Sequence, residues 1–270
     1  MVAFAANSLL CRLALGEKLI DAASFTSARV ISGAAMLFLI LLARHGRRMG
    51  AAPDWRAVAM LFAYMAFFSF AYLSLTAGTG ALILFGAVQL TMFAVALREG
   101  EPFPPLSWAG LTLAIAGLVY LVSPGLSAPD PLGALLMAVA GVAWGVYSLL
   151  GRAAADPLQA TAMNFAGCVP LALIVSLLFV GMYSASPAGL ALAVASGALT
   201  SGCGYVIWYA ALPGLSAARA ATVQLSVPVI AAIGGVIFLS EQITLRLLLA
   251  SAATLGGVAI VLAQRSARRP

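Results

Sequence analysis

The sequence predicts an all-α membrane protein with ten transmembrane helices arranged as two inverted five-helix repeats. Charged residues make up 8% of the 270 residues, hydrophobic residues 63%, and the mean hydropathy is +1.08. A soluble domain carries about 25% charged residues. Long uncharged stretches separate these few charges, and short patterns recur in the same order in the two halves of the chain.

This composition excludes a cytosolic enzyme, a disordered chain and a nucleic-acid-binding module, because a soluble fold of this size cannot bury so much apolar surface. The net charge of +6 reflects membrane topology, since Lys and Arg collect in cytoplasmic loops. We therefore expect membrane lipid as the environment and no nucleic-acid partner.

The ten spans follow from the uncharged stretches. A membrane-spanning helix needs roughly 20 mostly apolar residues, and turn residues such as Gly78–Gly80 and Ser184–Pro187 divide the longest stretches. The stretches lack the alternation of membrane β-strands. The predicted helices cover approximately 1–14, 22–43, 55–76, 80–98, 104–123, 131–151, 158–180, 187–211, 215–239 and 245–264.

The first span is short and lacks the charged start and cleavage site of a signal peptide. Its repeat partner, 131–151, is longer, so we expect the first helix to be truncated and the natural chain to begin upstream of Met1.

The basic residues predict the orientation. With both termini in the cytoplasm, most of the 14 basic residues lie in inner loops or the tail, as the positive-inside rule requires. Only Lys18 among them is a lysine, and this bias with abundant Ala favours a bacterial source and the inner (plasma) membrane. The inner set is Arg44, Arg47, Arg48, Arg56, Arg98, Arg152, Arg219, Arg265, Arg268 and Arg269.

An internal repeat divides the chain into residues 1–124 and 131–264. Ser8–Leu10 recurs as Ser148–Leu150, and Val88–Leu90 as Val223–Leu225. Each half holds five spans, and because five is odd the second half enters the membrane from the opposite side. Inverted repeats of this kind are typical of secondary transporters, whose substrate site lies near the midplane between the halves.

The ends of the two halves resemble the EamA-type, ten-helix branch of the drug/metabolite transporter superfamily. Gly100–Pro102 and Ser240–Arg246 are similar to the family's corner motif, and each precedes a Gly-containing last helix. Phe25–Arg29 is similar to the segment that carries an Arg near the start of the family's second helix. The resemblance implies a carrier that works by alternating access, similar to bacterial exporters of amino acids and related metabolites.

The polar residues do not suit catalysis. His45 is the only histidine and lies in an Arg-rich loop, and Cys11, Cys168 and Cys203 lack metal-ligand spacing. We therefore expect no enzyme activity, no catalytic residue, no metal site and no cofactor.

The candidate substrate-binding residues are polar or aromatic groups inside the spans. Gln89 and Gln224 hold equivalent places in the repeat, where a buried amide either joins two helices or lines a cavity. The aromatic residues either pack in the core or contact substrate. The full set is Asn7, Tyr64, Phe68, Gln89, Trp144, Tyr147, Ser148, Asn164, Tyr205 and Gln224.

Three further residues have two interpretations each. Arg29 is the one charge well inside a span, where it either contacts a substrate charge or extends to the interface. Pro170 and Pro228 fall inside spans, where they form either a hinge at the site or a lipid-facing kink.

We expect a monomeric or homodimeric transporter that exports small neutral or zwitterionic metabolites, in particular hydrophobic or aromatic amino acids. One alternative is a drug or other metabolite carrier of the same fold. The alternative from another class is a non-transporting membrane scaffold or receptor.

Overall fold

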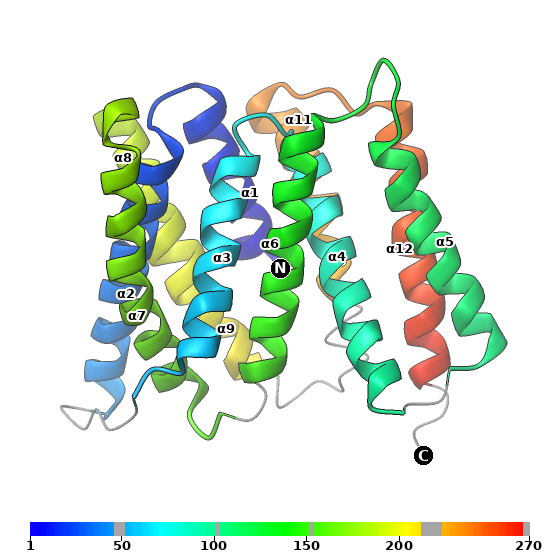
Figure 1. Cartoon of the computed structure of the whole chain (residues 1–270), viewed down its shortest axis with the longest axis horizontal. Helices are drawn as coiled ribbons and strands as arrows, with labels where there is room; N and C mark the ends of the chain where they lie inside the picture. The colour runs from blue at the N-terminus through cyan, green and yellow to red at the C-terminus, as the bar shows by residue number, and fades with distance from the viewer. Residues whose placement is uncertain (46–51, 101–102, 152–153, 212–222, 267–270) are drawn as a thin grey trace.

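The computed structural model describes residues 1–45, 52–100, 103–151, 154–211 and 223–266, which form a bundle of helices (Figure 1). The elements are α1 (Val2–Gly16), α2 (Ala22–His45), α3 (Trp55–Ala71), α4 (Ala77–Arg98), α5 (Pro105–Val122), α6 (Pro131–Gly151), α7 (Pro157–Leu178), η1 (Val180–Met182), α8 (Pro187–Ala195), η2 (Ser196–Cys203), α9 (Gly204–Ala211), α11 (Ser226–Leu239) and α12 (Leu245–Ser266).

Within these ranges, seven helical stretches are long and apolar enough to cross a membrane, with α8, η2 and α9 counted as one stretch. Helices α1, α3 and α11 are also apolar but shorter. The prediction of an all-α membrane protein is confirmed.

Local signals fix where the helices begin. The side chains of Asp54, Thr76, Asp156 and Ser186 each accept a hydrogen bond from a backbone N–H in the first turn of the helix that follows. Such caps satisfy N–H groups that have no partner within the helix. Helices α5, α6, α7 and α8 begin with proline, whose missing N–H costs nothing at that position.

The helices run side by side along the height of the bundle in Figure 1. Helices α2, α7 and α8 form one edge and α5 and α12 the other. The chain starts part-way up the bundle, so the beginning of α1 lies at mid-height, and α12 ends at the lower end.

Packing between the helices follows a regular scheme. Helix α6 packs against α3 and α4, and α1 packs against α8, η2 and α11. Helix α2 packs against α7, α8 and η2, and α3 against α7. Helix α4 also packs against α11, and α5 against α12. A single large core of buried side chains therefore fills the region between α1–α4 and α6–α11.

Helices α5 and α12 meet along a seam of small residues. A Cβ at Gly110 would lie 2.6 Å from the carbonyl oxygen of Gly257, and one at Gly117 would lie 2.6 Å from Oγ1 of Thr254. Glycine at these places lets the two backbones approach closely.

Helix α3 ends at Ala71, whereas its predicted span ends at 76. Two further elements differ from the predicted spans. Helix α4 begins at Ala77, because Thr76 caps it, so Gly78 and Gly80 lie in its first turn and not in the connection. The predicted span 187–211 has a π-helical segment, η2, in its middle. Glu101 and the first part of the predicted span 215–239 lie outside the described residues.

Candidate functional site

A buried arginine forms the middle of a polar centre between α2, α3 and η2. Arg29 of α2 is 0% exposed. Its Nη2 donates to the Tyr64 hydroxyl at 3.1 Å and its Nε to the Ser201 hydroxyl at 3.3 Å. The guanidinium carbon lies 5.2 Å from the centroid of the Tyr64 ring and 5.0 Å from that of Phe68, within the range of cation–π attraction.

An amide continues this polar centre toward the second half of the chain. Asn7 of α1 donates from Nδ2 to the Tyr64 hydroxyl at 3.4 Å. Its Oδ1 accepts from the hydroxyls of Ser196 at 2.6 Å and Thr200 at 3.3 Å. Ser196, Thr200 and Ser201 all belong to η2, and π-helical segments are frequent at functional sites.

Aromatic rings form one wall of the centre. The Trp144 ring of α6 lies 4.9 Å from Tyr64 and stacks on Tyr205 at 5.1 Å. Phe4 of α1 contacts Trp144 and Tyr205, and Phe165 of α7 contacts Tyr205. The wall therefore joins α1, α3, α6, α7 and α9 around the polar groups.

The structure brings six of the sequence-predicted residues together in this way: Asn7, Arg29, Tyr64, Phe68, Trp144 and Tyr205. Tyr147 adjoins them, with its ring 5.6 Å from Trp144. The Ser148 hydroxyl donates to the Trp144 carbonyl within α6. Asn164 is buried on α7 beside Phe165.

The two glutamines lie on other elements. Gln89 is buried in α4, and Gln224 precedes α11. Nε2 of Gln89 and Oε1 of Gln224 have no hydrogen-bond partner among the described residues. Their role in substrate binding stays a prediction.

The two prolines differ in their surroundings. Pro170 lies inside α7 on an exposed face of the helix. Pro228 lies in the first turn of α11, just after a helical break at Leu225. The break is expected because proline has no N–H to bond the carbonyl four residues earlier.

Sequence reasoning missed Ser196, Thr200 and Ser201, together with Phe4 and Phe165. Small hydroxyl residues are common in apolar spans, so the sequence carries no signal that separates these three from other serines and threonines. Their repeated placement within one short segment, 196–201, is the one pattern that indicates a shared face.

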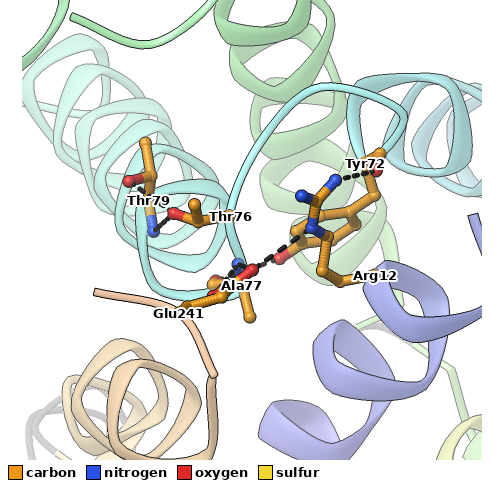
Figure 2. Close-up of polar contacts among 6 residues, drawn as sticks. All are labelled: Arg12, Tyr72, Thr76, Ala77, Thr79 and Glu241. Atoms are coloured by element: carbon orange, nitrogen blue, oxygen red, sulfur yellow. Dashed lines mark hydrogen bonds and ion pairs between the residues drawn. The ribbon is translucent and has the colours of Figure 1, made fainter. Parts of the chain in front are cut away.

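A second polar cluster joins the end of α1, the start of α4 and the connection between α11 and α12 at the upper end of the bundle (Figure 1 and Figure 2). Arg12, near the end of α1, donates to the Glu241 carboxylate at 3.2 Å and to the Tyr72 carbonyl at 3.2 Å. Glu241, between α11 and α12, also accepts from the backbone N–H of Ala77 at 2.9 and 3.1 Å. A carboxylate is favourable there, since Ala77 begins α4.

Burial raises the pKa of the Glu241 carboxyl above its ordinary value, and the Ala77 N–H and the Arg12 guanidinium offset only part of this effect. The Arg12–Glu241 contact is the only ion pair within the described part of the chain.

At the same end, the connection between α1 and α2 forms backbone hydrogen bonds with the connection between α7 and α8. The N–H of Asp21 donates to the Ser184 carbonyl at 2.7 Å, and the N–H of Ser186 donates to the Leu19 carbonyl at 2.8 Å. Burial acts to raise the pKa of Asp21, but hydrogen bonds from Ser24, Ser184 and Ala23 outweigh it and hold the pKa below its ordinary value. The upper end thus holds several contacts between residues far apart in sequence.

A pocket of about 160 Å³ lies toward the opposite end, where α2 ends and α7 begins. Its lining includes Tyr205 of the aromatic wall. No group of three His, Cys, Asp or Glu that could hold a metal ion occurs in the described ranges. The pocket is lined by Leu37, Arg44, Asp156, Pro157, Leu158, Thr161, Tyr205, Val206 and Ala210.

Comparison with known proteins identifies the family. The profile of the EamA-like transporter family matches residues 131–263. Uncharacterized protein PA1977 of Pseudomonas aeruginosa is 51% identical over 99% of this chain and 93% of its own length. The chain belongs to the EamA-like transporter family. The expected resemblance is confirmed, and the protein is a multi-pass bacterial membrane transporter.

More distant relatives carry functional names. An uncharacterized transporter of Archaeoglobus fulgidus is 27% identical over 93% of this chain and 91% of its own. The threonine/homoserine exporter RhtA of Salmonella typhimurium is 34% identical over 52% of this chain and 49% of its own. A solved crystal structure, 21% identical, matches 99% of this chain and 98% of that chain with a TM-score of 0.65, which shows the shared fold.

Proposed function

We propose that this transporter exports small neutral or zwitterionic metabolites, in particular hydrophobic or aromatic amino acids, across the bacterial inner membrane by alternating access. The observation that carries the proposal is the buried centre around Arg29. It combines hydrogen-bonding groups with an aromatic wall and takes residues from α1, α2, α3, α6 and η2.

Alternating access needs one end of this centre closed while the other is accessible. The upper end is closed by the Arg12–Glu241 pair and by the paired connections at 19–21 and 184–186. The pocket approaches the aromatic wall from the lower end. In this proposal substrate enters from the pocket and leaves when the upper contacts separate.

The packing scheme supports the division into residues 1–124 and 131–264. Exchanging α1 with α6, α2 with α7, α3 with α8–η2, α4 with α11 and α5 with α12 converts the contacts described above into one another, although the α2–α3 contact has no comparable counterpart between α7 and α8–η2. For example, the α3–α6 contact becomes the contact of α1 with α8 and η2. Two halves of this kind can rock against each other around a central site.

The proposed orientation has both termini and the pocket on the cytoplasmic side. The lower end carries the ends of α2, α4 and α12 and the start of α3 (Figure 1). Arg44, Arg98 and Arg56 occupy those helix ends, which agrees with the positive-inside rule. Export from this side is consistent with the name of the exporter RhtA.

A reconstituted system tests the function. Purified protein in liposomes is loaded with unlabelled L-phenylalanine or L-threonine, and uptake of the labelled amino acid by counterflow is measured. We expect counterflow with at least one of them, faster for phenylalanine, because the wall is aromatic. A panel of cationic dyes and nucleosides tests the alternative carriers of the same fold.

A matched pair of variants connects transport to the site. Trp144→Ala removes a ring from the wall, whereas Trp55→Ala removes one that is 63% exposed at the start of α3. We expect the first to reduce counterflow at least tenfold and the second to leave it near wild type. Absence of counterflow for every compound would contradict transport and favour a membrane scaffold or receptor.

A further inference from the structure

The charge of Arg29 is not compensated within the described chain. Arg29 makes no ion pair with any described Asp or Glu, and its Nη1 has no hydrogen-bond partner there although the side chain is fully buried. A charge removed from water is unfavourable unless it is paired and fully hydrogen-bonded. The centre is therefore incomplete without an additional negative group.

The Tyr64 hydroxyl beside Arg29 also lacks a hydrogen-bond acceptor. The Tyr64 hydroxyl oxygen accepts hydrogen bonds from both Arg29 and Asn7. Its own hydroxyl hydrogen is thus left to donate, and no acceptor for it occurs among the described residues. Arg29 Nη1 and the Tyr64 hydroxyl are two donors in one place, which suits the two oxygens of a carboxylate.

The site offers much less to a cation. The nearest amide oxygen, Oδ1 of Asn7, already accepts from Ser196 and Thr200. No described carboxylate lies beside Arg29 to bind an ammonium group. A single arginine also suits a monoanion better than a phosphate dianion, for which clusters of basic residues are typical.

We propose that Arg29 is the carboxylate-binding residue of the transport site, so that the protein recognises monocarboxylates with an apolar or aromatic body and does not require an α-amino group. This inference rests on the proposed function and narrows it. The Trp144 and Tyr64 rings contact the body of the substrate, and Arg29 and Tyr64 hold its carboxylate. Amino acids are substrates because of the carboxylate they share with amine-free acids.

The test compares analogues that lack one group each. Counterflow of labelled L-phenylalanine into wild-type proteoliposomes is measured with unlabelled 3-phenylpropanoate, which lacks the amine, or with 2-phenylethylamine or phenylalaninamide, which lack the carboxylate. We expect 3-phenylpropanoate to compete within about threefold of phenylalanine. The other two should compete roughly 10- to 100-fold less well, as expected for loss of a hydrogen-bonded charge pair.

Variants test whether recognition of the carboxylate depends on Arg29. Arg29→Gln should abolish competition by 3-phenylpropanoate and reduce phenylalanine counterflow at least tenfold. Arg29→Lys should retain part of the phenylalanine counterflow, because lysine keeps the positive charge but lacks the planar guanidinium group. Arg56→Gln, an exposed change at the start of α3, should have no effect. Thermal stabilisation of the purified protein by 3-phenylpropanoate, lost in Arg29→Gln, gives a readout independent of transport.

The outcomes separate the two proposals. If phenylalanine is transported but 2-phenylethylamine competes as well as 3-phenylpropanoate, or Arg29→Gln transports normally, the inference is wrong and the transport function stands. If neither phenylalanine nor 3-phenylpropanoate is transported or stabilises the protein, the proposed substrate class itself fails. The analogue series uses wild-type protein, so it decides the question even if Arg29→Gln does not fold.

Discussion

Removing the charge of Arg12 should open the upper end of the bundle. Arg12→Gln removes the ion pair with Glu241 and the bond to the Tyr72 carbonyl. It also leaves the Glu241 carboxylate, which is largely buried beside Ala77, without a cation. The substitution therefore acts on a contact that joins α1 to the connection between α11 and α12.

The magnitude follows from the two hydrogen bonds that the substitution removes. A hydrogen bond to a charged group contributes about 1.5–3 kcal/mol. The side chains of Arg12 and Glu241 are 24% and 12% exposed, so solvent screening weakens the pair. We take about 1.5–3 kcal/mol for both Arg12 hydrogen bonds together, which shifts the equilibrium toward the open upper end by roughly 10- to 100-fold.

The chain contains its own reporter for this opening. Cys11 is 0% exposed and lies one helical turn beyond Asn7 on α1, between the upper closure and the polar centre. In a background with Cys168→Ala and Cys203→Ala, maleimide labelling of Cys11 in membranes measures how often water reaches this region. We expect labelling to be roughly 10- to 100-fold faster with Arg12→Gln.

The control is Glu17→Gln, an exposed acidic residue at the same end of α1. It changes a nearby charge without touching the pair, and labelling should stay at the wild-type rate. An unchanged rate in Arg12→Gln, or an equal increase in both variants, would refute the reasoning that the Arg12–Glu241 contact holds the upper end closed.

Three further predictions concern pH, packing and the polar centre. Because the pKa of Glu241 is raised when the upper end is closed, closure is favoured below that pKa and weakened as the pH rises through it. Cys11 labelling, normalised to the unfolded protein at each pH, should therefore increase as the pH rises above the ordinary carboxyl pKa, and a flat profile would contradict this. Gly197→Ala should lower thermal stability, because its Cβ would overlap Ser32 and the Arg29 carbonyl, whereas Gly256→Ala, with open space around it, should not. Tyr64→Phe should weaken phenylalanine counterflow about 3- to 30-fold with little loss of stability, since the ring remains and a single hydroxyl is removed; normal counterflow would place the hydroxyl outside the site.

The sequence by itself determined the class, the set of helices and several members of the candidate site. Hydropathy is a local property, so each apolar stretch indicates its own helix, and residues such as Asp54 and Asp156 mark where helices begin. Arg29 was identifiable because a charge inside an apolar span is rare. Aromatic residues spaced along one helical face, such as Tyr64 and Phe68, were identifiable for the same local reason.

Only the tertiary structure decided which of these residues meet. Arg12 and Glu241 are 229 positions apart, and Asn7 and Ser196 are 189 apart, so their contacts depend on how the helices pack. The π-helical segment η2 places Ser196, Thr200 and Ser201 beside Asn7 and Arg29. Whether a helix adopts π-helical turns such as those of η2 depends on its packing, here against α1 and α2. The same packing brings residues of both halves of the chain to one buried arginine.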